Sequence, residues 1–155
     1  MTNDIEKAGR FTRPRLFGYQ TVYGFFTQVW IGRLRLHVFL KPDPGEAMHD
    51  HPWSFTSLPL VSYVEEMVDE ATGDVRTNVV RAFRLNSRPA TLAHRYLGKW
   101  SGKGDAVVPG VVITLCWRGR GGRSWQYVRF HKGSLRRYPW RAYLRHIGQL
   151  PSRHE

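Results

Sequence analysis

Short stretches rich in β-branched and aromatic residues alternate with turn sequences along most of this chain. Residues 33–40 alternate polar and apolar side chains, which is typical of a strand with one buried face. Turn signals follow at 42–45, 71–74 and 86–89, and residues 75–85 read as one strand between the last two. This pattern predicts about eight to ten short strands in a β-sandwich or a small jelly-roll barrel. Residues 138–147 predict one closing helix, with Pro139 in its first turn.

The 155 residues are expected to form a single domain over residues 16–150, preceded by a polar, flexible segment at 1–15. Cys116 is the only cysteine, so the chain forms no internal disulfide and needs no oxidising compartment. No apolar run approaches the roughly 20 residues of a membrane span, and the first residues lack the apolar core of a signal peptide. We therefore expect a cytoplasmic protein with no membrane partner.

Three histidines form the strongest candidate site in the sequence. His49 and His51 lie two residues apart, so on a strand they project from the same face about 7 Å from each other. Two imidazoles at that spacing can converge on one ion, at about 2.0–2.1 Å for zinc. His94 is the best candidate for a third nitrogen, contributed by a neighbouring strand. The sequence thus predicts one divalent ion on three histidines, and these ligands do not discriminate among Fe, Zn, Mn and Ni.

The chain is strongly basic. Twenty-four lysines and arginines against twelve acidic residues give a formal net charge of +12. Such a charge attracts small anionic molecules, phosphates or nucleic acid, although a bias toward arginine codons explains it equally well. The basic residues are densest between positions 118 and 145. Within that region, 118–123 resembles arginine–glycine segments that bind RNA, but its glycines are explained more simply by a hairpin loop.

The histidine motifs resemble those of the cupin superfamily. Cupins are small β-barrels whose first motif contains His-x-His after a Gly-rich turn, as His49 and His51 do here, and whose second motif has the spacing of Pro89 and His94. The string from His49 to Phe55, with Trp140 near the end of the chain, is similar to uncharacterised cupin-like proteins of bacteria and bacteriophages. The resemblance implies an all-β, double-stranded β-helix (the jelly-roll or cupin barrel) with a short C-terminal helix, and it makes a homodimer an expectation.

Some positions depart from the cupin pattern. Many cupins supply a glutamate four or five residues after the second histidine, where this chain has Phe55 and Thr56. Glu65 and Glu66 lie further along and are not expected to replace it, unless a bulge at Pro59 brings them near. The loss of that ligand fits a three-histidine centre, and it also fits a barrel that has abandoned its metal.

Several other residues are candidates for lining the pocket around such an ion. Trp53 and Phe55 continue the face of the two histidines. Tyr63, Arg81, Phe83 and Arg84 lie on segments that can face the same interior. Most such aromatic residues are simply core. An arginine inside a barrel is more informative, because an unpaired buried charge is costly and an anionic substrate is its natural counter-charge.

Two polar residues near these motifs are expected to have no role in ligand binding. Asp50 should point away from the histidines, as a turn or surface carboxylate, with a hydrogen bond to an imidazole as the minor alternative. His37 lies on the polar face of an alternating strand and is expected to be structural or exposed.

The sequence favours a metal-dependent cupin enzyme, an isomerase, lyase or dioxygenase, acting on a small anionic molecule. Two alternatives remain at this point. One is a non-catalytic barrel that binds a nucleotide or nucleic acid through its arginines, with salt-sensitive affinity. The other is a phage accessory or host-interaction protein that uses the barrel as a scaffold.

Overall fold

The computed structural model describes residues 17–22, 26–69, 71–131 and 134–148. The segment 1–15, expected to be flexible, lies outside the described residues. No helix among the described residues is long and apolar enough to cross a membrane.

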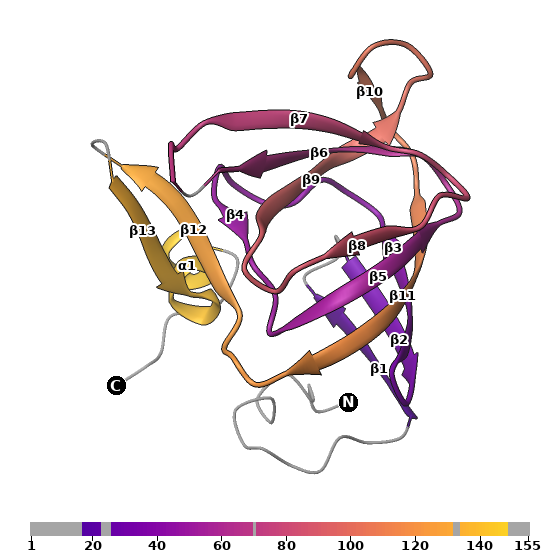
Figure 1. Ribbon diagram of the computed structural model, residues 1–155, viewed down its shortest axis with the longest axis horizontal. Helices are drawn as coiled ribbons and strands as arrows, with labels where there is room; N and C mark the ends of the chain where they lie inside the picture. The colour runs from indigo at the N-terminus through magenta and orange to yellow at the C-terminus, as the bar shows by residue number, and fades with distance from the viewer. Residues whose placement is uncertain (1–16, 23–25, 70, 132–133, 149–155) are drawn as a thin grey trace.

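Two antiparallel sheets form the body of the molecule (Figure 1). The first, sheet A, has the strand order β1 (Phe17–Val22), β2 (Phe26–Ile31), β3 (Leu34–Phe39), β11 (Val112–Gly121), β5 (Trp53–Pro59), β8 (Asn86–Arg88). The second, sheet B, has the order β13 (Ser134–Pro139), β12 (Gln126–His131), β4 (Met48–His49), β9 (Ala93–Trp100), β6 (Tyr63–Val68), β7 (Val75–Val80), and β10 (Val107–Val108) pairs with β9. Helix α1 (Trp140–His146) follows β13 and lies beside β12 and β13 (Figure 1). The predicted all-β jelly roll with a short C-terminal helix is therefore confirmed.

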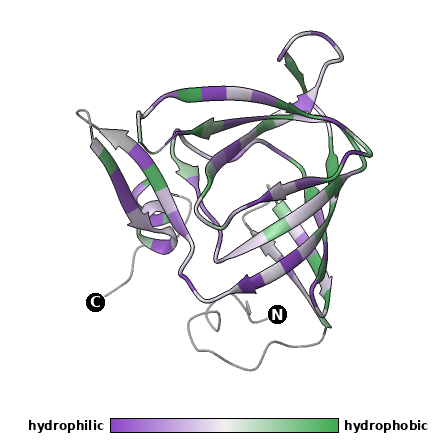
Figure 2. Ribbon diagram, in the orientation of Figure 1, coloured by the Kyte–Doolittle hydropathy of each residue, from purple (hydrophilic) through white to green (hydrophobic). Residues whose placement is uncertain are grey.

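The core consists of three clusters of buried side chains on sheet B and at its junctions. One cluster joins α1 to β12, with Leu144 and Tyr127 at 0% and 1% exposure. A second joins β4, β6, β9 and β12, and a third joins β6, β7, β9 and β11. Hydrophobic and hydrophilic residues alternate along many of the strands (Figure 2), as expected where one face of a sheet is buried. These clusters fix the strands that carry the histidines.

The strand expected over residues 75–85 is shorter than predicted. It ends at Val80, because the backbone then turns and its N–H groups leave the ladder: that of Ala82 donates to Ser62 Oγ at 2.8 Å, and that of Phe83 donates to the Pro59 carbonyl at 2.8 Å. Phe83 has a φ of 59°, a left-handed conformation that non-glycine residues seldom adopt. The turn carries residues 81–85 out of the sheet.

Strand β3 buries the face that its sequence marks as polar. Its leucines lie outside, with Leu34 43% and Leu36 36% exposed, whereas Arg35 is only 6% exposed. His37, which was expected to be structural or exposed, lies on the same side of β3 as Arg35. Its Nε2 is buried and has no hydrogen-bond partner. The interior of sheet A is therefore polar where the alternation predicted an apolar face.

Candidate metal centre

The three predicted histidines lie together inside the barrel. His49 on β4 is directly opposite His94 on β9, and His51 follows two residues later. The Nε2 atoms of His51 and His94 are 2.7 Å apart. One ring nitrogen from each of the three lies within 4.8 Å of the other two, and no further cluster of three such groups occurs in the described part of the chain. The cross-strand pairing of His49 with His94 is what brings the two sequence motifs to one point.

Glu65 fixes the orientation of the His94 ring. Its Oε2 lies 2.8 Å from His94 Nδ1, and its side chain is fully buried. Since a carboxylate accepts, Nδ1 donates the proton, and the lone pair of His94 Nε2 points at the other histidines, where it accepts from His51 Nε2 at 2.7 Å. Carboxylates hold metal-bound imidazoles in this way in many proteins. Glu65, judged too far along the chain to take part, is therefore a component of the site.

Glu65 also accepts hydrogen bonds from two further side chains. Arg88 on β8 forms a close ion pair with it, and Asn78 on β7 donates to its Oε1 at 3.0 Å. Burial by itself raises the pKa of Glu65, but the hydrogen bond from His94, the charge of Arg88 and the hydrogen bond from Asn78 lower that pKa to about 2. The carboxylate is thus ionised and holds three donors from three different strands.

A second carboxylate lies behind His49. Asp43 Oδ2 is 3.3 Å from His49 Nδ1, without the angle of a hydrogen bond, and it accepts the backbone N–H of Tyr96 at 2.7 Å. Burial raises the pKa of Asp43 to about 6, against the lowering effects of Tyr96, His94 and Arg95. Asp43 belongs to the turn sequence just before the histidine strand, which was interpreted only as a turn. Its position directly before that strand was the available signal.

Two of the three imidazoles are neutral near pH 7. Burial is the main cause of the low pKa of His49 and of His51, and neighbouring histidines lower each of them further. Neutral imidazole is the form that binds metal, and the proton that His51 Nε2 shares with His94 Nε2 is the one that has to leave the centre before both nitrogens face one ion. The set therefore fits a divalent ion held by three nitrogens, with the remaining coordination positions open to another molecule.

Phe55 is the pocket candidate that lies closest to the histidines. Its ring is edge-on to His51 with centroids 4.7 Å apart, and 6.4 Å from that of His94. Trp53 is half-buried, and the guanidinium groups of Arg35 and Arg118 lie 4.9 and 4.8 Å from the centre of its ring. Tyr63 is 9% exposed and belongs to a core cluster with Tyr96.

The structure does not bring Arg81, Phe83 and Arg84 to this site. All three are exposed, because the chain leaves the sheet after β7. Arg81 lies over the Trp100 ring at 3.8 Å. The arginines that do enter the barrel come from β3, β8 and β11, and the sequence did not single them out as pocket residues.

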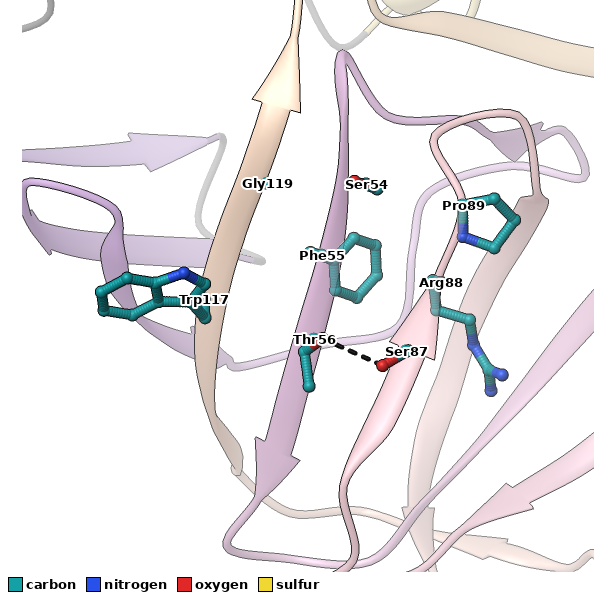
Figure 3. A pocket seen from close by; sticks show the side chains of 8 residues that line it. All are labelled: Ser54, Phe55, Thr56, Ser87, Arg88, Pro89, Trp117 and Gly119. Carbon is teal, nitrogen blue, oxygen red and sulfur yellow. Dashed lines mark hydrogen bonds between the residues drawn. The ribbon is translucent and has the colours of Figure 1, made fainter.

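A surface hollow of about 330 Å³ lies over β5, β8 and β11 beside the site (Figure 3). Two of the residues that line it, Phe55 and Arg88, also contact the site, through His51 and Glu65 respectively. Across the hollow, Thr56 and Ser87 are joined by a hydrogen bond of 2.9 Å. Since Ser54, Ser87 and Trp117 are exposed, the hollow lies on the outer face of sheet A.

Asp50 is not the surface carboxylate that was expected. It does point away from the histidines, but it is fully buried and accepts Arg123 at 2.7 Å, Arg137 at 2.8 Å and the backbone N–H of Gln126 at 2.9 Å. It contacts none of the three imidazoles. Two arginines of the basic stretch 118–145 are thus anchors for the strands around β4.

No protein-family model and no curated protein matches the sequence. Solved structures do match. Hydroxypropylphosphonic acid epoxidase from S. wedmorenis in complex with fosfomycin is 10% identical, over 76% of this chain and 63% of that chain, with a TM-score of 0.50. Its iron(II) form gives 11% identity over 76% and 64%, also at 0.50. The match thus spans less than two thirds of the epoxidase chain.

The cupin domain of Drosophila melanogaster CENP-C is 11% identical over 66% of this chain and 75% of that chain, with a TM-score of 0.49. At identities of 10–11%, the likeness to the epoxidase, with its TM-score of 0.50, concerns the fold alone. It agrees with the two-sheet, cupin-like jelly roll that the histidine motifs led us to expect.

Proposed function

We propose that this protein is a metal-dependent cupin-type enzyme that holds one divalent ion on His49, His51 and His94. One observation carries the proposal: the three ring nitrogens converge within 4.8 Å, and Glu65 occupies the far nitrogen of His94. A buried histidine cluster with a purely structural role does not need a carboxylate that turns the lone pair of one ring toward its centre. Three protein ligands with open positions are typical of catalytic rather than structural sites.

When bound, the ion supplies Lewis-acid polarisation of a substrate oxygen, or the redox chemistry of a dioxygenase. The chain's own residues prepare the site for either. Glu65 keeps the proton of His94 on Nδ1, and Arg88 keeps Glu65 in place. Phe55 covers one side of His51 and excludes water from it.

The reaction class remains part of the proposal: an isomerase, a lyase or a dioxygenase. Imidazole ligands suit several first-row metals, so the ion has to be identified by experiment. The epoxidase that shares the fold has been solved as an iron(II) protein, which makes iron the first ion to test.

The test is metal content. The full chain, stripped with a chelator, is reconstituted with Fe(II) under anaerobic conditions, or with Zn, Mn or Ni, then desalted and assayed by elemental analysis. We expect about one ion per chain in the wild type, and little in His49→Ala or His94→Ala. The control is His146→Ala, which removes an exposed imidazole on α1 and should keep the ion. Equal metal in the wild type and His94→Ala would overturn the proposal.

A further inference from the structure

The inner face of sheet A carries a row of polar side chains that the metal site does not use. Cys116 on β11 is opposite Arg35 on β3 and opposite Ser57 on β5. Arg118 follows two residues after Cys116, on the same face of β11. Directly opposite side chains lie about 5 Å apart at Cβ, so Arg35, Ser57 and Arg118 surround Cys116 on one patch of the barrel wall.

Arg35 is buried, and none of the described carboxylates pairs with it. It is 6% exposed, it donates one hydrogen bond to Gln28 Oε1 at 3.2 Å, and its Nε has no partner. Its guanidinium lies 5.2 Å from the Trp30 ring and 4.9 Å from the Trp53 ring. Indole faces stabilise a cation in part, but they accept no strong hydrogen bond from its N–H groups.

Arg118 adds a second positive charge to the same patch. The Arg118 guanidinium lies 4.8 Å from the centre of the Trp53 ring. This indole is therefore close to one arginine from β11 and to another, Arg35, from β3. The buried Nε of Arg118 and the buried hydroxyl of Ser57 both lack hydrogen-bond partners. Within the part of the chain that the structure describes, neither arginine forms an ion pair with a carboxylate.

Two like charges gathered in a buried place oppose folding unless something compensates them. The pKa of Arg35 reflects this, since burial, and then the charge of Arg118, lower it to about 10. At neutral pH the Arg35 guanidinium still carries its charge. Among the described side chains, the partners of the buried Glu65 are His94, Arg88 and Asn78, and neither Arg35 nor Arg118 is one of them.

This patch adjoins the histidines. Arg118 is opposite Phe55 in the ladder of β11 and β5, and the Phe55 ring contacts His51. His37, two residues after Arg35 on β3, lies on the same face of that strand, with its Nδ1 3.4 Å from Cys116 Sγ. The unpaired donors and the three imidazoles therefore face the same interior.

We propose that Arg35, Ser57 and Arg118 form a binding site for an oxyanion, the carboxylate or phosphate group of a small organic molecule. Guanidinium groups match the oxygens of both groups, and charge-assisted hydrogen bonds are the stronger ones. If the proposed function holds, this molecule is the substrate: Arg35, Ser57 and Arg118 bind its anionic group, and the remainder of the molecule reaches the metal ion. Binding of the anion itself does not require the ion.

The experiment measures anion binding by the metal-free protein. Isothermal titration calorimetry is run on the chelator-treated full chain with inorganic phosphate and, separately, with acetate, at an ionic strength held constant with chloride. Saturable binding of one of them identifies the preferred group. Arg118→Gln, which is half-buried and should fold, is expected to weaken that binding by about tenfold or more, as loss of one charge-assisted hydrogen bond implies. Arg35→Met should do the same.

The matched control is Arg81→Gln. It also removes one positive charge and one arginine–tryptophan contact, but at the exposed site over Trp100. Equal weakening in this control and in Arg118→Gln would contradict the inference, because it would assign the anion to the general +12 charge. Absence of binding by the wild type with both anions would contradict it as well.

The same proteins are also reconstituted with metal, which separates this inference from the proposed function. Arg118→Gln should bind the ion like the wild type, and His94→Ala should bind the anion like the wild type. If the wild type binds an anion but no metal, the proposed metal-dependent function is contradicted and the anion site is retained. If it binds metal but neither anion, the anion site is contradicted and the proposed function is retained.

Discussion

The substitution Glu65→Gln removes the charge that holds three strands together next to the histidines. Glu65 is fully buried, and its partner Arg88 keeps 18% of its side chain exposed. Breaking a buried ion pair by changing one partner costs about 3–5 kcal/mol. We expect about 3 kcal/mol here, at the low end, because Arg88 can still reach solvent and the amide oxygen can still accept one hydrogen bond.

The same change should weaken metal binding. A glutamine can accept from His94 or from Arg88 but not from both, and its NH₂ then faces another donor. The His94 ring then loses its fixed orientation. Loss of a hydrogen-bond partner that orients a metal ligand typically lowers metal affinity by about 10–100-fold. Unfolding in urea followed by tryptophan fluorescence gives the first quantity, and competition with a coloured zinc chelator gives the second.

The control is the neighbouring residue on the same strand. Glu66 forms an ion pair with Arg95 in which both side chains are about one-fifth exposed, and it contacts no histidine. Glu66→Gln should therefore cost at most about 1 kcal/mol and leave metal affinity unchanged. Equal losses in the two variants, in stability or in affinity, would refute the role assigned to Glu65.

Two further predictions concern stability. Asp50→Asn removes the carboxylate that Arg123 and Arg137 share and should lower the free energy of unfolding in urea by about 2–3 kcal/mol, less than for a fully buried pair because both arginines are about one-third exposed. The control is Glu46→Gln, which breaks an exposed ion pair and should change that free energy by less than about 0.5 kcal/mol. Similar losses in the two variants would contradict the account. Burial, and then the charge of Arg35, lower the pKa of His37 to about 3, so the unfolded chain takes up a proton below pH 6.5 that the folded chain refuses. The contribution of His37 to the free energy of unfolding is complete above pH 6.5 and falls by up to about 1.4 kcal/mol per pH unit toward pH 3. In His37→Gln, the slope of the unfolding free energy against pH should therefore be smaller by about that amount. An unchanged slope would show that His37 is not buried and neutral.

The sequence carried enough information for the fold and for the three histidines. Turn sequences and β-prone stretches indicated a jelly roll, and the spacing of His49 with His51 required one face of a strand. These patterns alone did not say which strand lies beside the one that carries His49. The spacing of the second motif suggested His94, and in the pairing of β4 with β9 this residue is directly opposite His49.

Glu65 could not be found in this way, because its place depends on strand register. The pairing of β6 with β9 shifts between Val64 and Glu65, so the carboxylate reaches His94 although the residue directly opposite His94 is Met67. A shift of this kind depends on contacts between strands distant in sequence. Counting residues along one strand does not reveal it.

Arg35 was overlooked for a different reason. Alternation identifies two faces of a strand, and the apolar face is assigned to the core by default. In β3 the leucines are outside and the arginine is inside. The burial of Arg35 reverses the default, and nothing local in the sequence marks the reversal.

X-ray absorption at the metal edge of the reconstituted protein tests the central claim most directly. With zinc, we expect three imidazole nitrogens at about 2.0–2.1 Å, with oxygen ligands such as water in the remaining positions. In His94→Ala, which should retain little zinc, any zinc that remains should show no more than two imidazoles, whereas His146→Ala should keep three. A spectrum without imidazole scattering, or one that is identical in the wild type and His94→Ala, would contradict the three-histidine centre.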